Sequence, residues 1–385
     1  MLAAAALLPG AAPAAPRTLL AVIEGTNQRA LVRVDARTLV PVGERLPLGV
    51  LSGPFVRSPD DLLLAVGAGS GIAFLDPAGM RNLGEMHLKP YPNVAILNWP
   101  STRVLFAQTC CPDTDRLLVV DPTTRRVVAR AALWFDTSGT ATLPDAIAYL
   151  ASPSNRIGPA SVIVIGADGN SQLFVPLSRI SAGRHWHKVH GVQVLELRQP
   201  GFTVDPDQRV AYVVASSTLA AELDLRAGTV AYHAVAAGST RRLAQTEKEF
   251  NGTTRYARWL GNGRIAVAGT RFTRSTTSSG VTASPAGVAL LDTRTWRMQT
   301  LDSAANGFVA DGSYLLALEA RAVKAFTTDG ALRATIPAAG GVLYAQLFDG
   351  LAYVWTQKSV TIFDLDAGAL VSTLARPALY LIGPG

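Results

Sequence analysis

The sequence lacks the apolar periodicity of amphipathic helices along nearly its whole length. Apolar runs of about four to eight residues, rich in valine, isoleucine, leucine, tyrosine and phenylalanine, occur instead. Glycine, proline, aspartate, serine and asparagine separate these runs, as turn residues separate strands. The missing helical pattern excludes a helical bundle and an alternating α/β fold, and it predicts an all-β protein.

Long uncharged apolar stretches are also missing after residue 16, where none reaches the roughly 18 residues of a membrane helix. The first 16 residues, MLAAAALLPGAAPAAP, are different, because they form an alanine-rich run that ends in small residues and prolines. They resemble the apolar part and cleavage region of a secretory signal, although no basic residue precedes them. A disordered Ala/Pro tail is the alternative. We therefore separate residues 1–16 from one domain over residues 17–385, and expect a secreted, periplasmic or cell-surface protein.

Lysine is scarce, with only five among the 35 Lys and Arg residues, although the net charge is +7. Arginine-rich, lysine-poor usage can reflect the base composition of a genome, so the charge alone does not indicate nucleic acid. No basic run with interleaved aromatic residues is present either. We predict no nucleic-acid partner, and an anionic small molecule, a glycan, an envelope component or another protein instead.

Catalytic motifs are absent as well: there is no G-x-S-x-G, no H-E-x-x-H and no P-loop lysine. Acidic pairs such as Asp60/Asp61 and Asp113/Asp115 fall in turn sequences, where capping of backbone amides accounts for them. We predict no catalytic residue.

What the sequence does contain is a pair of repeated turn signals. One precedes an apolar run, as in RSPDDLLLAV from Arg57 and VDPDQRVAYVV from Val204. The other is an aspartate that leaves the next apolar run, where its carboxylate can cap backbone amides and start a hairpin. It occurs at Asp35, Asp76, Asp121, Asp224, Asp292 and Asp364.

Between these signals each unit contains four antiparallel strands, A to D, in about 35 to 56 residues, the size of a propeller blade. We predict a single β-propeller of eight four-stranded blades, with seven as the alternative. The predicted B strands begin at Leu19, Leu62, Val104, Val162, Val210, Ile265, Leu315 and Leu351. The first unit has no A strand, and an extra apolar run, ALYLIGPG, follows the last unit. This C-terminal run is predicted to complete the first blade and close the ring.

The combination of SPD turns with segments such as LLVVDPTTRRVVA and TIFDLDAGALVS resembles the bacterial YVTN / quinoprotein-like β-propeller repeats. The resemblance extends over nearly all of residues 17–385. It implies a fold that supports binding proteins and enzymes alike.

Four long connections are predicted on one face of the ring, the face of the B–C and D–A loops. Long loops on one rim of a rigid scaffold usually carry function, whereas neutral drift would place them on both rims. The predicted connections are Gln108–Asp115, Trp134–Pro144, Ala237–Arg255 and Thr270–Gly287.

A positive lobe is predicted at the two longest of these connections, suited to carboxylate, sulfate or phosphate, with a solvated basic surface as the alternative. It contains Arg241, Arg242, Lys248, Arg255, Arg258, Arg271 and Arg274. The predicted A strands place further residues at the central channel, where core packing is the alternative for the tryptophans. These residues are Arg57, Asn98, Trp99, Arg258 and Trp259. The ligand-binding candidates are Arg57, Trp99, Arg241, Arg242, Arg258, Trp259 and Arg271.

Cys110 and Cys111 are the only two cysteines, and they are adjacent. In an exported protein they can pair with each other, and the resulting ring would be strained, since neighbouring Cα atoms lie about 3.8 Å apart. Two reduced cysteines are the alternative. A ring of adjacent cysteines on a propeller resembles the pyrroloquinoline-quinone alcohol dehydrogenases. Their tryptophan motif A-x-D-x-x-T-G-x-x-x-W is absent, so no cofactor is predicted and pyrroloquinoline quinone is kept as an alternative.

Three of the five histidines cluster in RHWHKVHG. On a strand, His185 and His187 would share a face, a spacing that can hold a transition metal, whereas His190 has the opposite parity. A surface histidine cluster without metal is the main interpretation.

The sequence thus favours an exported, non-enzymatic scaffold that binds a ligand or partner protein through its long-loop face. The alternative is a propeller enzyme with its site at the channel mouth. It would be a quinone- or metal-dependent oxidoreductase, or a lyase or hydrolase of an anionic polymer. A third hypothesis is a structural subunit of a surface assembly.

Overall fold

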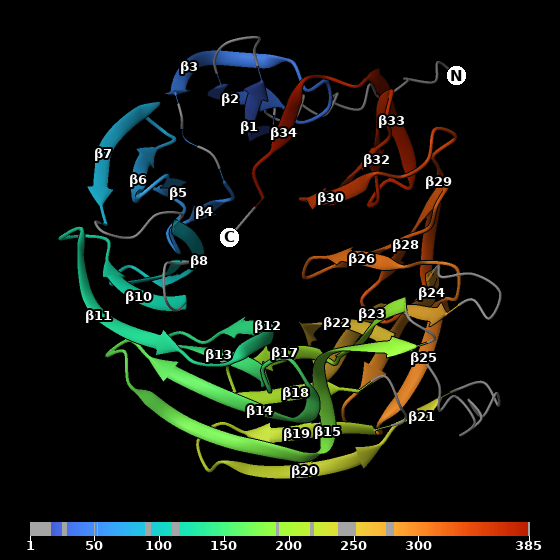
Figure 1. Cartoon of the computed structure of the whole chain (residues 1–385). Helices are drawn as coiled ribbons and strands as arrows, with labels where there is room; N and C mark the ends of the chain where they lie inside the picture. The colour runs from blue at the N-terminus through green and yellow to red at the C-terminus, as the bar shows by residue number, and fades with distance from the viewer. Residues whose placement is uncertain are drawn as a thin grey trace, which may run out of the picture.

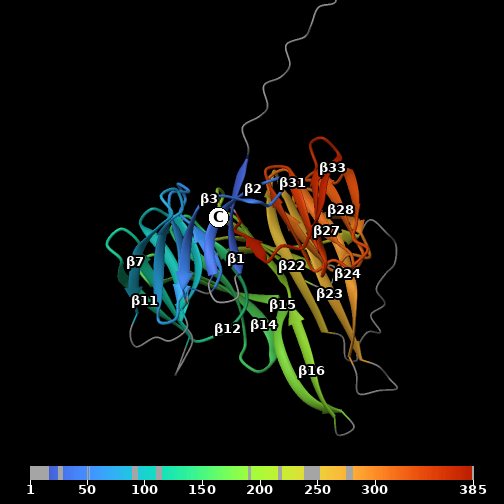
Figure 2. The ribbon, with the colours of Figure 1, turned by 90° about the horizontal axis from the view of Figure 1, so that it is seen from above.

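The structure is a computed structural model of the chain. It describes residues 17–24, 29–49, 51, 53–88, 94–109, 115–189, 192–215, 219–237, 252–274 and 281–383. All regular elements of these residues are β strands, arranged as sheets around a central axis (Figure 1). Figure 1 shows the sheets as one ring, and the view turned by 90° shows that the hairpin of β15 (Ser171–Val189) and β16 (Val192–Gln199) projects from it (Figure 2). The prediction of a single all-β propeller is confirmed. Within the described residues, no helix has the length and apolar character needed to cross a membrane.

Six of the sheets stand alone and have four antiparallel strands each. The first contains β34 (Leu379–Leu381), β1 (Thr18–Glu24), β2 (Arg29–Asp35) and β3 (Pro41–Gly49). The next two contain β4 (Phe55–Arg57), β5 (Leu64–Ala68), β6 (Gly71–Asp76) and β7 (Arg81–His87), then β8 (Val94–Ser101), β9 (Val104–Thr109), β10 (Asp115–Asp121) and β11 (Arg126–Leu133). The fourth contains β17 (Gly201–Asp205), β18 (Val210–Val214), β19 (Leu219–Asp224) and β20 (Thr229–Ala234). The fifth contains β26 (Gly307–Ala310), β27 (Tyr314–Leu318), β28 (Ala322–Thr327) and β29 (Leu332–Pro337). The sixth contains β30 (Tyr344–Phe348), β31 (Leu351–Trp355), β32 (Ser359–Asp364) and β33 (Ala369–Ala375).

The seventh sheet has ten strands. In sheet order they are β12 (Asp136–Thr142), β13 (Ala146–Ser152), β14 (Ile157–Gly166), β15 (Ser171–Val189), β16 (Val192–Gln199), β22 (Gly252–Gly261), β23 (Arg264–Arg274), β24 (Val281–Asp292), β25 (Arg297–Asp302) and β21 (Ala236–Ala237). A short parallel pairing of β16 with β22 joins its two halves. Because only six sheets stand alone as four-stranded blades, the predicted count of eight separate blades is not confirmed, and neither is seven.

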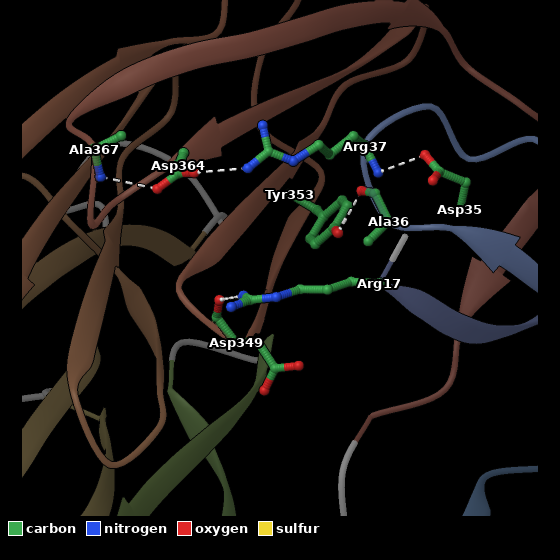
Figure 3. Close-up of polar contacts among 8 residues, drawn as sticks. All are labelled: Arg17, Asp35, Ala36, Arg37, Asp349, Tyr353, Asp364 and Ala367. Atoms are coloured by element: carbon green, nitrogen blue, oxygen red, sulfur yellow. Dashed lines mark hydrogen bonds and ion pairs between the residues drawn. The ribbon is translucent and has the colours of Figure 1, made fainter. Parts of the chain in front are cut away.

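The ring is closed by its C-terminal strand, as the sequence predicts. Strand β34 pairs antiparallel with β1, with Ala21 opposite Leu381, and Ile382 N donates a hydrogen bond to Leu20 O at 2.9 Å. Side chains of the last four-stranded sheet reinforce the seam (Figure 3): Tyr353 Oη donates to Ala36 O at 2.6 Å. Next to it, Arg37 Nη2 lies 3.2 Å from Asp364 Oδ2. The first and last parts of the chain are therefore held together by a strand ladder and by side chains.

The repeated aspartates cap the turns between the third and fourth strands, which confirms their predicted role. Asp121 Oδ1 accepts hydrogen bonds from Thr123 N at 2.8 Å and from Thr124 N at 3.2 Å, and Asp121 Oδ2 accepts one from Thr124 Oγ1. Hydrogen bonds of this kind favour the charged carboxylate and hold the pKa of Asp121 below its usual range. Asp35, Asp76, Asp224, Asp292 and Asp364 accept equivalent backbone bonds.

The core lies between neighbouring sheets, where the apolar faces of consecutive units meet. Trp99 is 4% exposed and contacts Phe74 of the preceding sheet edge to face, with ring centroids 5.9 Å apart. Side chains along a strand point alternately to the two faces of its sheet. Because neighbouring sheets cover both faces, residues on both faces of the inner strands are apolar, and these strands appear in the sequence as continuous apolar runs.

The predicted strand register of the fourth unit is wrong by one strand. Val162 lies in β14, the third strand of its unit, and the turn LASPSNRI connects the second and third strands. The true second strand is β13, AIAYLAS, all of whose residues are buried. Its A strand, β12, has the sequence DTSGTAT, which looks like a loop because it carries almost no apolar residue.

Candidate binding face

The four predicted long connections have different outcomes. The connection Trp134–Pro144 is wrong, because residues 136–142 form β12 and only Trp134 and Phe135 link it to β11. The ladder to the buried strand β13, with Thr140 opposite Tyr149, holds this polar segment extended. The residues of β12 favour a loop by themselves, but pairing with the buried strand β13 makes them a strand.

Much of Thr270–Gly287 is strand as well. Strands β23 and β24 continue as a hairpin as far as the pair Arg274 and Val281, and residues 275–280 lie outside the described part. The connection Ala237–Arg255 ends earlier than predicted, because β22 begins at Gly252. Residues 238–251, with Arg241, Arg242 and Lys248, lie outside the described residues, as do Cys110 and Cys111 in the connection Gln108–Asp115. The predicted disulfide and these basic residues stay predictions.

A projecting hairpin, which the sequence pattern does not indicate, is the most prominent feature of the long-loop face. Strand β15 pairs with β14 as far as Gly183 opposite Ile157. Beyond Gly183 its partner is β16, from the pair Gly183 and Arg198 to the pair Val189 and Val192. These residues extend beyond the ring as a two-stranded arm (Figure 2). We name residues 184–189 and 192–198 the β15–β16 arm. The segment RHWHKV shows no alternation of apolar and polar residues, so it carries no strand signal.

One face of the β15–β16 arm carries exposed apolar side chains. Trp186 lies directly opposite Leu195, and the two side chains are 55% and 37% exposed. Arg184 and Lys188, two residues to either side of Trp186 on the same strand, share this face and are exposed. The face therefore presents a Trp–Leu pair between two cations.

Of the predicted histidine pair, His185 lies opposite Glu196 and His187 opposite Val194 in the strand ladder. The side chain of His187 and the whole of His190 lie outside the described part of the chain. Among the residues the structure describes, no group of three or more His, Cys, Asp or Glu side chains is placed to hold a metal ion. Metal binding at His185 and His187 stays a hypothesis without a third ligand.

Two arginines of the predicted positive lobe lie together. In the ladder of β22 and β23, Arg255 is opposite Gly269 and Thr253 is opposite Arg271, so Arg255 and Arg271 are diagonal neighbours on one face. Burial and the charge of Arg271 lower the pKa of Arg255. Arg258 is on the opposite face of β22, towards Asp311, which counteracts the lowering of its pKa by burial. Arg274 follows on β23, at the edge of the described residues.

The other candidate residues are spread over the ring. Trp259 stacks on Tyr212 with centroids 5.3 Å apart, and burial and the charge of Glu222 raise the pKa of that tyrosine to about 12. Trp99 is a core residue between two sheets, and the Oδ1 of Asn98 accepts a hydrogen bond from the Trp99 amide. Packing therefore accounts for both tryptophans without a ligand, and their ligand-binding role stays a prediction.

Arg57 lies at a cavity of about 900 Å³ on the other rim, that of the tight turns. Its Nε donates to Gly383 O at 2.9 Å, and its Nη1 is 3.6 Å from Asp61 Oδ1. Arg17 and Arg33, which also line this cavity, donate to backbone carbonyls of neighbouring turns. The arginines of this cavity are thus already engaged in holding the ring together.

Comparisons with known proteins show similarity in fold only. No protein-family model matches the sequence, and no curated protein matches it. Among solved structures, dihydro-heme d1 dehydrogenase NirN in complex with DHE aligns with a TM-score of 0.62 and 13% identity, over 98% of this chain and 78% of NirN. BamB from Moraxella catarrhalis aligns with a TM-score of 0.47 and 10% identity, over 87% of this chain and 92% of BamB. At 13% identity, the similarity to NirN shows the β-propeller fold alone.

Proposed function

We propose that the protein is an exported, non-enzymatic β-propeller scaffold, and that the β15–β16 arm binds an acidic surface of a partner protein. The observation that carries this proposal is the exposed pair of Trp186 and Leu195 on a hairpin that projects from the ring. The position of the arm, on the face predicted to carry the long connections, supports it.

The apolar area exposed on the arm is a source of binding energy. A two-stranded hairpin has no second sheet to cover its faces, so Trp186 and Leu195 remain in water at a cost of about 25 cal/mol per Å² that a partner could remove. Trp is strongly enriched among the residues that dominate binding energy, because one rigid ring buries much area for little lost entropy.

Charge selects the kind of partner. Arg184 and Lys188 flank Trp186, and the only ion pair that either forms among the described residues is the long contact of Arg184 with Asp136, at 4.0 Å. A carboxylate-bearing surface would complement these cations and speed the encounter. An acidic protein surface with an apolar pocket for the indole therefore fits the arm best.

The proposal includes a count of eight blades and export. The eight-blade count rests on treating β12–β15 and β22–β25 as two antiparallel units inside the ten-stranded sheet. It is supported by eight clusters of buried apolar residues in the described part of the chain, each between two consecutive four-strand units. Export rests on residues 1–16 and their resemblance to a secretory signal.

A peptide selection tests the arm. A random peptide library displayed on phage is panned against the protein, with removal of phage that bind Trp186→Ala. We expect acidic peptides with an apolar residue, whose affinity falls at least about tenfold in Trp186→Ala, or about 1.4 kcal/mol. Arg184→Gln with Lys188→Gln should weaken binding and flatten its salt dependence.

Trp134→Ala is the matched control, because Trp134 is 69% exposed but lies between β11 and β12, away from the arm in sequence, and is stacked on Phe174. Peptide affinity should stay the same in this variant. Equal loss in Trp134→Ala and Trp186→Ala, or no peptide that distinguishes the wild type from Trp186→Ala, would contradict the proposal.

A further inference from the structure

We propose that Arg255 and Arg271 form a binding site for one oxyanion group, a carboxylate, phosphate or sulfate, at the junction of the β22–β23 hairpin with β17. This site goes beyond the proposed function and does not depend on the β15–β16 arm. Both side chains are partly exposed, so a ligand can reach them.

The strand register brings the two guanidinium groups to one place. Arg255 and Arg271 are diagonal neighbours on the face of the hairpin that packs against β17. On the same face, Ala257 lies so close to β17 that a Cβ added to Gly201 would be 3.0 Å from the Ala257 Cβ. Trp259, two residues further on, donates its backbone N–H to Thr203 Oγ1 at 2.8 Å. Close packing at Ala257 and Trp259 fixes the strand that carries Arg255.

Gly269 makes room for the aliphatic part of Arg255. A Cβ at Gly269 would lie 3.0 Å from Arg255 Cδ and closer still to the backbone oxygen of Thr254. The arginine side chain therefore lies across a position where any other residue would displace it. Gly269 also lies at a register shift of β23 against β24, and its lack of a side chain lets the Thr254 backbone approach as well.

The charge of Arg255 is not balanced by the described residues. Its Nε is buried and has no hydrogen-bond partner there, and the neighbouring charge that acts on it is another cation, Arg271. A partly buried cation whose Nε has no partner is costly, and a second cation beside it increases the cost. By contrast, Arg198 of the adjacent β16 pairs with Glu196 at 3.1 Å.

An oxyanion would satisfy both requirements at once. Its oxygens accept hydrogen bonds from the planar guanidinium of Arg255, while its charge offsets the repulsion between Arg255 and Arg271. Two neighbouring arginines that have no carboxylate partner among the described residues can recognise the acid group of a ligand.

Binding of small oxyanions to the whole protein tests this site. The probes are sodium sulfate, glucose 6-phosphate and galacturonate, with sodium chloride at equal ionic strength as the reference, and the readouts are titration calorimetry and the thermal unfolding midpoint. We expect saturable binding of at least one probe, weakened at least tenfold in Arg255→Gln and in Arg271→Gln. The three probes distinguish free sulfate, a sugar phosphate and a sugar carboxylate as sources of the same chemistry.

Arg258→Gln is the matched control, since Arg258 is on the same strand with its side chain on the opposite face. Its affinity for the probes should equal that of the wild type. The proposal is overturned if all three variants bind alike, or if no probe binds more tightly than chloride. Gly269→Ala, which obstructs the path of the Arg255 side chain, should weaken binding without removing either charge. The unliganded Arg255→Gln protein should unfold at the same or a higher temperature than the wild type, which separates lost binding from lost folding.

Discussion

Two buried tyrosines, Tyr353 and Tyr149, have the same hydroxyl group in different surroundings. Both residues are fully buried, and burial raises the pKa of both hydroxyls. Tyr353 Oη donates a 2.6 Å hydrogen bond to Ala36 O across the closing seam, whereas Tyr149 Oη has no partner among the described residues. A satisfied buried hydroxyl stabilises a fold, and an unsatisfied one destabilises it.

Replacing each tyrosine by phenylalanine should therefore change stability in opposite directions. Tyr353→Phe should lower the free energy of unfolding by about 1 kcal/mol, because Ala36 O loses its donor. Tyr149→Phe should leave it unchanged or raise it. Guanidinium unfolding at neutral pH measures both values, and a larger loss for Tyr149→Phe would contradict this account.

Single residues also show what the sequence could reveal about the site. The aspartate caps were predictable, because an aspartate bonds to backbone amides two and three residues ahead, as Asp121 does with Thr123 and Thr124. The sequence could predict that Arg255 and Arg271 belong to the same basic region, but not that their side chains are neighbours. Their proximity depends on the register of β22 with β23, and a shift of one residue would place the two side chains on opposite faces.

Among the strands, β34 shows how much a three-residue element can contribute. Leu379 and Leu381 are 8% and 3% exposed and pack between the first and last four-stranded sheets. Gln346 Nε2 also donates to Leu381 O at 3.0 Å. The strand thus joins the two sheets through its side chains and its backbone.

Leu381→Ala should destabilise the protein by about 2–5 kcal/mol, since it leaves a cavity in this core. Leu370→Ala on β33 is the control: Leu370 is 59% exposed, and its loss should cost less than about 0.5 kcal/mol. Thermal or denaturant unfolding of the two variants gives the comparison. Similar small losses in both would mean that β34 does not hold the ring closed.

Strands β12 and β15 mark the limit of prediction from short apolar runs. The sequence could predict that the C-terminal run closes the ring, because the first unit lacked one strand and an extra apolar run followed the last unit. Strand β12 was missed because its stability comes from pairing with the buried β13 rather than from its own residues. The β15–β16 arm was missed because β15 continues past the end of its sheet, and repeat spacing carries no information about such an extension.

Around the ring, aspartate carboxylates at many turns accept hydrogen bonds from backbone amides of the same turn. Hydrogen bonds to turn amides and hydroxyls lower the pKa of several aspartates below the usual 3.8, among them Asp35, Asp121, Asp224 and Asp292. A carboxyl whose pKa is lower in the folded than in the unfolded chain stabilises the fold above its unfolded pKa. That stabilisation disappears as the pH falls through the folded pKa.

Stability should therefore be nearly constant from pH 7 to about pH 5 and fall steeply below about pH 4. The double variant Asp121→Asn and Asp292→Asn should be less stable at pH 7 and lose less on acidification. Urea unfolding midpoints between pH 2.5 and pH 7 provide the test. Parallel curves for the wild type and the double variant would show that these aspartates do not cause the acid sensitivity.

The pairing of β34 with β1 has a consequence for biosynthesis. Strands β1 and β34 are separated by the other strands of the described ring, so their pairing can form only after those strands have been synthesised. Before that, the array is an open arc in which this edge of β1 is unpaired, and an unpaired strand edge is a template for contact with other chains.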